Sequence, residues 1–276
     1  YRLIPSFGKI LQNYLGFRFN IQAAENLSRD KSKFDNQKNQ INKDIIKFDF
    51  KEKIDFKNIS FSFSKNKDLG SNLIFNDVNL NIIKGQKIGI LGVTGSGKST
   101  FLDLIMGLIT PHKGNILIDG KKIEDVKSSW QKSIGCVPQE VFILDDTLKK
   151  NIAFGLPEKL INIEKVNRAI ELANLTNFKN SLNFGLETLL GESGSRLSGG
   201  QRQRIGIARA LYTEPNILIF DEATNALDIQ TEKKILGEIF SVKKDSTIIF
   251  VSHNKNNLTN CDLIYEVRDK NLYILK

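Results

Sequence analysis

One short segment constrains the fold of this chain more than any other, the run GVTGSGKS at residues 92–99. It follows the apolar run at residues 88–91, which is typical of a buried strand. It precedes a helical pattern formed by Phe101, Leu102, Ile105 and Leu108. A glycine-rich turn between a strand and a helix lets backbone N–H groups converge on phosphate oxygens, and the helix N-terminus adds partial positive charge. The sequence therefore predicts a phosphate-binding loop in an α/β fold.

Two side chains of this loop have specific roles in that prediction. Lys98 is expected to reach the β- and γ-phosphates, and the Ser99 hydroxyl is expected to coordinate Mg²⁺. The plainer alternative, a glycine-rich turn with a chance lysine, is disfavoured by the flanking strand and helix patterns. The residues expected at the phosphates are Gly92, Thr94, Gly95, Ser96, Gly97, Lys98, Ser99 and Thr100.

A second buried-strand pattern, at residues 217–220, ends in two carboxylates. Asp221 at the end of this strand is expected to hold a hydrated metal ion, and Glu222 is expected to polarise a water molecule aimed at the γ-phosphate. Acidic pairs after a strand are usually ordinary loop residues. A phosphate loop in the same chain makes the catalytic interpretation the better one.

Composition limits the other possibilities. The chain has 276 residues, 40% hydrophobic and 26% charged, which is typical of a globular protein. The longest uncharged stretch, residues 88–97, is far shorter than the ~20 apolar residues of a membrane span. The net charge of +9 is concentrated in residues 1–60, where arginine and aromatic interleaving typical of a nucleic-acid groove is absent. Two cysteines make neither a disulfide framework nor a zinc site.

Residues 10–21 carry apolar side chains at helical spacing, and residues 28–43 have almost no apolar content. We expect a helix followed by a linker, with divisions at residues 1–27, 28–50 and 51–276. Beyond the linker, short strand patterns alternate with helical ones, which favours a mostly parallel sheet covered on both faces. The expected strands lie at 59–63, 88–91, 134–137, 217–220 and 247–251.

The run LSGGQ at residues 197–201, followed by RQRIGIARAL at 202–211, resembles the signature of ATP-binding cassette (ABC) ATPases. It precedes the Asp221 and Glu222 pair, as in that family. A small-residue turn that opens a helix presents backbone amides and the Ser198 hydroxyl to an anion. A second anion-binding turn implies a nucleotide site completed by two surfaces, and therefore a dimer.

Other family elements can be assigned residue by residue. Phe63 resembles the aromatic residue that stacks on adenine, although tyrosine is more frequent there. Gln139 resembles the glutamine that links the metal site to the transmembrane partner, and Glu192 resembles the acidic residue of a short exporter motif. Asn225 begins a sequence similar to the loop that crosses the dimer interface, and His253 resembles the histidine at the γ-phosphate. Each has a plainer interpretation alone, but their family order over about residues 59–255 favours the functional one.

The resemblance implies a P-loop NTPase core with a mostly parallel sheet, an antiparallel β subdomain and an α-helical signature subdomain at about residues 140–205. It implies ATP and Mg²⁺ as cofactors. The catalytic residues would be Glu222, His253 and Lys98, and the metal ligands would be Ser99, Gln139 and Asp221. Beside the phosphate loop, the nucleotide would contact Phe63, Gln139, Asp221 and, from the opposite protomer, Ser198, Gly199, Gly200 and Gln201.

The same resemblance implies partners. These are a second nucleotide-binding domain, expected to be an identical copy arranged head to tail, and a transmembrane domain of the same polypeptide. The chain begins at Tyr1 and its one methionine is Met106, so we expect it to be a piece of a longer exporter. Residues 1–27, which include Pro5, would then be the cytosolic end of its last transmembrane helix, at the cytoplasmic face of the cell (inner) membrane. No nucleic-acid partner is expected.

Within exporters, four short strings are similar to bacterial lipid-linked oligosaccharide flippases. They are LIPS at 3–6, WQKSIG at 130–135, DDT at 145–147 and NCD at 260–262. Two alternatives from other classes were weighed. A soluble ABC ATPase acting on nucleic acid or ribosomes usually carries long coiled coils or two cassettes, which this chain lacks. A catalytically silent scaffold is disfavoured by Glu222 and His253.

Overall fold

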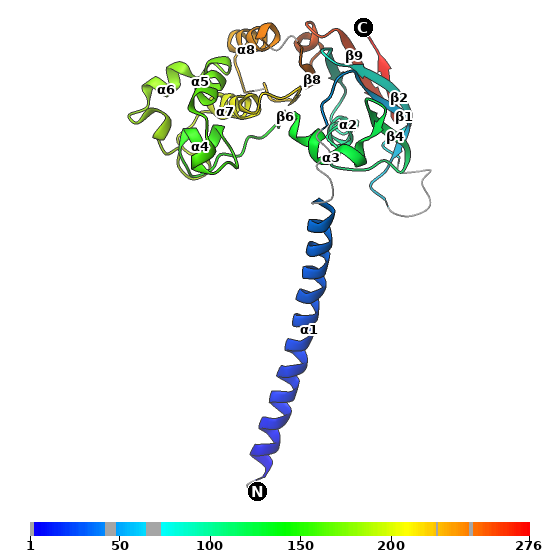
Figure 1. The fold of residues 1–276 in the computed structure, drawn as a ribbon, viewed down its shortest axis with the longest axis vertical. Coiled ribbons are helices and arrows are strands. Elements are labelled where there is room, and N and C mark those ends of the chain that lie inside the picture. Colours follow the sequence, from blue (N-terminus) through cyan, green and yellow to red (C-terminus); the bar gives the residue numbers. More distant parts are fainter. Residues whose placement is uncertain (1–2, 42–47, 65–72, 225, 243–244) are drawn as a thin grey trace. The chain divides into compact units, whose positions relative to one another are not determined.

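The computed structural model describes residues 3–41, 48–64, 73–224, 226–242 and 245–276 (Figure 1). The chain divides into two units, Tyr1–Lys47 and Phe48–Lys276, and each is described by itself. We expected divisions between residues 27 and 28 and between residues 50 and 51, with a linker between them.

In the first unit, the described residues form one helix, α1 (Ile4–Ile41). The expected helix at residues 10–21 lies inside it, but the helix continues through most of the segment that we interpreted as a linker. That segment has no proline or glycine, and its lysine, arginine and glutamine side chains have fair helix propensity, so its polarity did not indicate irregular structure. Among the described residues, no helix has both the length and the hydropathy needed to cross a bilayer.

The second unit contains a six-stranded sheet in the order β10-β9-β3-β8-β7-β6. Its neighbouring strands pair in parallel, except that β10 is antiparallel to β9, so the prediction of a mostly parallel sheet is confirmed. The strands are β3 (Lys87–Leu91), β6 (Ile134–Val137), β7 (Ile217–Asp221), β8 (Thr247–Ser252), β9 (Leu263–Arg268) and β10 (Asn271–Ile274).

A four-stranded antiparallel sheet, in the order β2-β1-β4-β5, forms the expected β subdomain. The strand predicted at residues 59–63 begins earlier, at Lys53, and ends earlier, at Phe61. Phe61 is the last residue of β1 that pairs with β2, and Phe63 beyond it is exposed. The strands are β1 (Lys53–Phe61), β2 (Phe75–Ile83), β4 (Lys113–Ile118) and β5 (Lys121–Lys122).

Helices gather in a region of their own within the second unit. Figure 1 shows α4, α5 and α6 on the left and the strands β1, β2 and β4 on the right. The helices are α2 (Lys98–Ile105), α3 (Ile123–Lys132), α4 (Leu148–Ile152), α5 (Ile163–Leu172), α6 (Thr176–Ser181), α7 (Gly199–Tyr212) and α8 (Ile229–Val242). Short 3₁₀ turns are η1 (Glu158–Leu160), η2 (Gly185–Glu187), η3 (Glu192–Gly194) and η4 (Lys255–Leu258).

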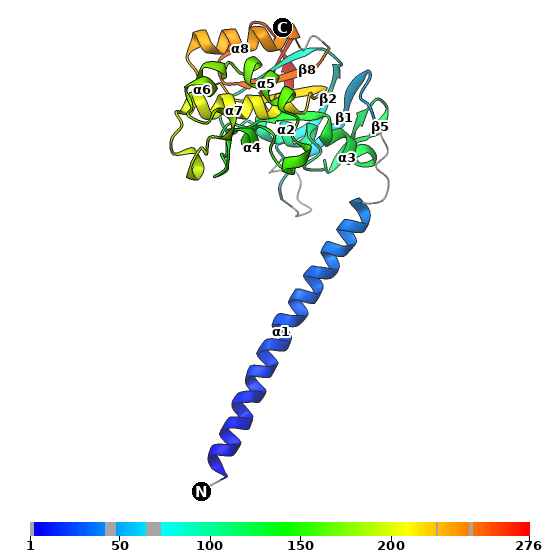
Figure 2. The ribbon, with the colours of Figure 1, turned by 60° about the vertical axis from the view of Figure 1, so that its left-hand side comes forward.

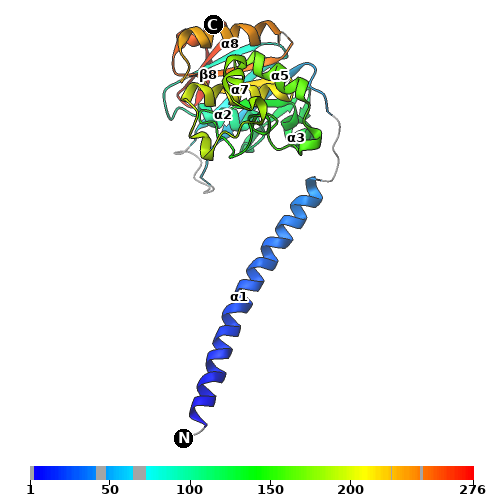
Figure 3. The ribbon, with the colours of Figure 1, turned by 90° about the vertical axis from the view of Figure 1, so that its left-hand side faces the viewer.

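Two hydrophobic cores lie on the two faces of the parallel sheet. In β7, Ile217 and Ile219 belong to the core that includes Trp130 of α3, whereas Leu218 and Phe220 belong to the core of the helical region. Alternate side chains of a strand point to opposite faces, so a continuous apolar strand supplies both cores. Figures 2 and 3 bring the second face forward, with α5, α7 and α8 toward the viewer.

Candidate nucleotide-binding site

The loop at residues 92–97 joins β3 to α2 and needs its glycines for two different reasons. Gly97, the N-cap of α2, has φ 109°, a left-handed conformation that side chains other than glycine rarely adopt. A Cβ on Gly92 would lie 2.6 Å from Ser96 Oγ and 3.1 Å from the carbonyl oxygen of Val267. The backbone of this loop therefore curls tightly in front of a helix N-terminus.

The hydroxyl oxygen of Ser96 could form a hydrogen bond with a ligand. Its Oγ is buried and has no hydrogen-bond partner among the described residues. Leaving such a group unpaired costs ~1–3 kcal/mol, so a native protein usually retains it for a reason. A phosphate oxygen at the loop would accept its hydrogen bond.

The lysine of the loop bends back over the loop. Lys98 is only 7% exposed, and its Nζ donates to the carbonyl oxygens of Gly92 (2.9 Å) and Val93 (3.1 Å). The same atom lies 3.6 Å from Glu222 Oε1. The ammonium group thus lies at the loop and next to the carboxylate that follows β7.

Asp221 and Glu222 occupy the carboxyl end of β7, in unlike environments. Burial raises the pKa of the half-buried Asp221, and the Glu222 carboxylate raises it further, while Lys98 acts in the opposite direction. Glu222 has φ 50°, an unusual backbone conformation for a non-glycine residue, and its N–H donates to the carbonyl of Val251 in β8 (3.2 Å). Such strain persists where the surroundings enforce it and often marks a functional site.

His253 completes a group of three side chains. Its Nδ1 lies 3.7 Å from Glu222 Oε2, and its side chain is largely exposed. Lys98, Glu222 and His253 follow β3, β7 and β8, which are adjacent in the sheet order. The fold therefore brings together three residues that are far apart in the sequence, at the carboxyl ends of parallel strands, where ligands of open α/β sheets bind.

The predicted metal ligands supply a hydroxyl, a carboxylate and an amide oxygen, a donor set that suits Mg²⁺. Ser99 is exposed in the first turn of α2, and Asp221 ends β7. Gln139 is exposed in the segment after β6, where it lines a cavity of about 510 Å³ together with Gly199 and Arg202.

The signature turn opens α7 with a capping box. Ser198 Oγ accepts a hydrogen bond from the Gln201 N–H (3.2 Å), and Gln201 Oε1 accepts one from the Ser198 N–H (2.8 Å). Ser198 is exposed at this helix N-terminus, as an anion-binding turn requires. Gln201, which we predicted at the nucleotide, has its carboxamide oxygen engaged in the cap. Helix α7 packs against α4, α5 and β6.

Phe63 presents an aromatic surface. Its side chain is 65% exposed, and its ring contacts Phe61 edge to face with centroids 5.0 Å apart. Glu192 begins η3 and is exposed. Asn225 lies outside the described residues, but the next residue, Ala226, donates its N–H to Gln203 Oε1 of α7 (3.0 Å).

The sequence analysis missed Asn151 and Arg209. Asn151 is fully buried in α4, and Arg209 of α7 donates to its backbone carbonyl oxygen (2.9 Å). A signal was present, because Arg209 interrupts the apolar stretch of residues 205–211. A charged residue in such a stretch usually has a buried polar partner.

The fold and the phosphate loop together define a P-loop nucleotide-binding domain, with a second small-residue turn at the start of α7. The sequence profile described as "ABC transporter" matches residues 75–225. That is more than half of the chain. The chain belongs to the ABC transporter family, and its second unit is an ATP-binding domain of the class that hydrolyses ATP.

Relatives include alpha-hemolysin translocation ATP-binding protein HlyB of Escherichia coli O157:H7, which is 42% identical over 76% of this chain and 29% of its own length. Toxin RTX-I translocation ATP-binding protein of Actinobacillus pleuropneumoniae is 41% identical over 78% of this chain and 30% of its own length. A solved bacterial Atm1-family ABC exporter with ATP bound has a TM-score of 0.75 and 32% identity, over 82% of this chain and 39% of that chain. This chain thus spans less than a third of the two curated relatives.

Proposed function

We propose that this chain is the ATP-hydrolysing motor of a membrane exporter and that hydrolysis takes place between two such domains arranged head to tail. The observation that carries this proposal is the convergence of Lys98, Glu222 and His253 at adjacent strand ends. Ser198 and Gly200 lie instead at the start of α7, where they would complete the site of a partner copy.

ATP binding would use the loop and the residues around it. The phosphates would accept hydrogen bonds from the loop amides and from Ser96 Oγ, while adenine stacks on the exposed ring of Phe63. Ser99, Asp221 and Gln139 would hold Mg²⁺, which neutralises charge on the phosphates when bound. Lys98 would exchange its two carbonyl partners for phosphate oxygens.

Glu222 would act on the attacking water molecule. Its carboxylate oxygens lie near Lys98 Nζ on one side and His253 Nδ1 on the other, so the carboxylate is oriented between two nitrogen groups. A carboxylate in this position can accept hydrogen bonds from a water molecule and aim it at the γ-phosphate. His253 would donate a hydrogen bond to the γ-phosphate.

ATP would then act as the link between protomers. Its charges would repel one another if unpaired, but they attract both the phosphate loop and the opposite signature turn. Closed and open dimers would differ in affinity for ATP and for its products. Hydrolysis would break the link between the protomers and so shift the equilibrium from the closed to the open dimer. The motion would drive a transmembrane domain of the same polypeptide at the cytoplasmic face of the inner membrane, with α1 as the end of its last helix.

The cargo has two candidates. The four short strings noted above favour a lipid-linked oligosaccharide or another lipid-like molecule. The names of the relatives favour a polypeptide, since these proteins are described as translocating toxins. ATP hydrolysis by the complete transporter in vesicles, stimulated by one cargo class and not by the other, would decide between them. A soluble role on nucleic acid predicts no membrane association of the complete protein on fractionation.

The test of the motor is Glu222→Gln in the full chain. Glutamine keeps the size of the side chain but cannot accept a proton, so ATP should still bind while turnover falls by ~10³-fold. The ATP-bound variant should accumulate as a dimer, measured by light scattering. Glu164→Gln on the exposed surface of α5 is the matched control and should behave as wild type. Normal turnover in the Glu222→Gln protein would remove Glu222 from its assigned role.

A further inference from the structure

We propose that Arg209 is a positioning residue that, with Asn151, fixes the segment following Gln139 to the signature helix α7. The two then move as one body and couple the two ATP sites of a dimer. This inference rests on the proposed function, since it assigns a task to a residue outside the group that contacts ATP.

Arg209 joins three parts of the chain. Its Nε donates to the backbone carbonyl of Asn151 (2.9 Å), and its Nη2 donates to the backbone carbonyl of Phe142 (2.9 Å). Its guanidinium group lies over the ring of Phe154, 4.5 Å from the centroid. Burial lowers the pKa of Arg209, which means that its charge is partly desolvated and depends on these partners.

Asn151 is the second half of the link. Its side chain is fully buried, and Oδ1 accepts the N–H of Leu144 (2.8 Å) while Nδ2 donates to the carbonyls of Leu144 (3.1 Å) and Thr147 (3.1 Å). Arg209 Nη2 also reaches Oδ1 at 3.4 Å. A buried amide with its donors and acceptors engaged fixes one backbone geometry, because any alternative leaves polar groups unpaired.

A separate packing contact places α7 against the same segment. Gly206 lies one helical turn before Arg209, on the same side of α7. A Cβ on Gly206 would lie 2.5 Å from Val141 Cγ2, which is too close for any side chain. The close packing of the Val141 side chain on Gly206 and the hydrogen bond from Arg209 to Phe142 therefore hold residues 141 and 142, two and three positions after Gln139, along one face of α7.

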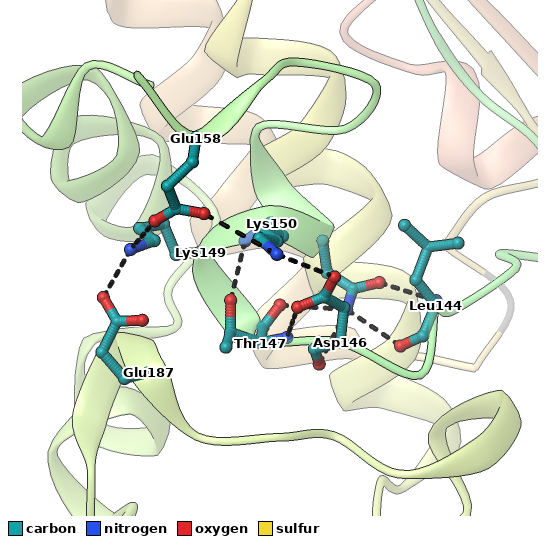
Figure 4. A network of polar contacts seen from close by, with 8 residues as sticks. Leu144, Asp146, Thr147, Lys149, Lys150, Glu158 and Glu187 are labelled. Atoms are coloured by element: carbon teal, nitrogen blue, oxygen red, sulfur yellow. Dashed lines mark hydrogen bonds and ion pairs between the residues drawn. The ribbon is translucent and has the colours of Figure 1, made fainter. Parts of the chain in front are cut away.

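The segment is also anchored from the other side, at α4. Figure 4 shows Lys149 paired with Glu187, and Lys150 paired with Asp146. The backbone of residues 188–190 pairs with residues 146–148, where the Leu148 N–H donates to Thr188 and the Leu190 N–H donates to Asp146. Helix α4 and the residues directly before it thus connect residues 187–190, upstream of the signature turn, to the segment that follows Gln139.

The consequence concerns two sites at once. Gln139 is proposed to contact the Mg²⁺ of the chain's own nucleotide, whereas Ser198 and Gly200 at the start of α7 are proposed to contact the partner's nucleotide. A rigid connection between them makes occupancy of one site bias the position of the turn that completes the other. That is a coupling free energy between sites, and it should be measurable as cooperativity.

Arginine suits this role because its planar fork can donate to two carbonyl groups at once, which a lysine ammonium on its flexible stem does not reproduce. The competing interpretation is that Arg209 only stabilises the fold. Arg204 is the matched control for that interpretation. It lies on the same helix, burial also lowers its pKa, and it donates to the carbonyls of Asn174 (2.8 Å) and Gly200 (3.3 Å), but not to the segment after Gln139.

The first readout needs no nucleotide. In the full chain, hydrogen–deuterium exchange over residues 139–147 should be about tenfold faster in Arg209→Lys than in wild type. The substitution removes charge-assisted hydrogen bonds, and the free energy lost with such bonds corresponds to about this change in rate. Arg204→Lys should leave exchange of these residues unchanged. Phe154→Leu removes only the partly exposed ring under Arg209 and should raise the exchange by about threefold, which provides a second variant that keeps the hydrogen bonds.

The second readout is kinetic. Arg209→Lys should retain the affinity for a fluorescent ATP analogue, lose about tenfold in kcat, and bring the Hill coefficient for ATP close to one. Arg168→Lys on the exposed surface of α5 is the kinetic control and should retain the wild-type values. Unchanged exchange over residues 139–147 in both Arg209→Lys and Phe154→Leu would overturn the link. A wild-type kcat and Hill coefficient in Arg209→Lys would overturn the coupling. Absence of ATP turnover in wild type would instead count against the proposed function, and the exchange readout would still decide whether the link exists.

Discussion

The phosphate-loop region and the helical region around α7 are built in different ways. In the first, the loop conformation comes from neighbouring residues, as in the contacts of Lys98 with Gly92 and Val93. In the second, the main contacts join distant parts of the sequence, as between Arg209 and Phe142. We conclude that changes in the loop should act first on nucleotide affinity, whereas changes in the helical region should act first on turnover and stability.

The largest effect is expected in the loop, from Lys98→Ala. Removing the ammonium group takes away charge-assisted contacts with the phosphates and should weaken ATP binding by ~100-fold, with little change in thermal stability. Titration with a fluorescent ATP analogue measures the affinity. Lys127→Ala on the exposed surface of α3 is the control. Unchanged binding would refute the phosphate-loop assignment and the contrast between the regions.

The next effect belongs to the helical region, from Gly206→Ala. Alanine favours a helix by ~1 kcal/mol over glycine, but here its Cβ would collide with Val141, so we expect a net destabilisation of ~1–2 kcal/mol. Gly237→Ala in α8 is the matched control, because nothing lies within 4 Å of its Cβ position, and it should be stabilising. Denaturant unfolding measures both. The same sign for the two variants would contradict the close packing at Gly206.

A smaller effect is expected at the signature turn, from Ser198→Ala. Loss of the helix cap should cost ~1 kcal/mol, or ~2–4 °C in Tm, even without nucleotide. Ser198→Thr retains a capping hydroxyl, and its Tm should be close to that of wild type.

In mixed dimers, Ser198→Ala chains and Lys98→Ala chains should leave at most one intact composite site, and two fully active sites would exclude the head-to-tail arrangement.

The smallest perturbation changes no residue and tests whether both hydrophobic cores stay closed in the native protein. Burial raises the pKa of Cys136, which packs against the core containing Trp130, to about 11, and that of Cys261 in the other core to about 11. A raised thiol pKa lowers the thiolate fraction at pH 8, so iodoacetamide should label the native protein ~100-fold more slowly than the urea-unfolded protein. The native rate should increase up to about pH 11. Rapid labelling of one cysteine alone would show that its core opens independently.

Much of the nucleotide site could be predicted from the sequence, because its motifs are contiguous and each combines turn chemistry with flanking strand or helix patterns. The strand at residues 217–220 and the loop at residues 92–99 lie where we expected them. The helical nature of residues 28–41 was missed, because polar composition by itself does not separate a linker from a solvated helix. The end of β1 before Phe63 was also missed, since alternation of apolar residues continues beyond the last paired residue.

By itself, the amino-acid sequence determined the family, the phosphate loop, the signature turn and the alternating strands and helices, because these depend on residues that are close together in the chain. Only the tertiary structure decided that Glu222 lies between Lys98 and His253, and that Arg209 donates hydrogen bonds to the carbonyl groups of Phe142 and Asn151. These contacts join residues tens of positions apart. Local propensity does not specify them, because they arise only when the strands pair in register and the helices pack on the sheet.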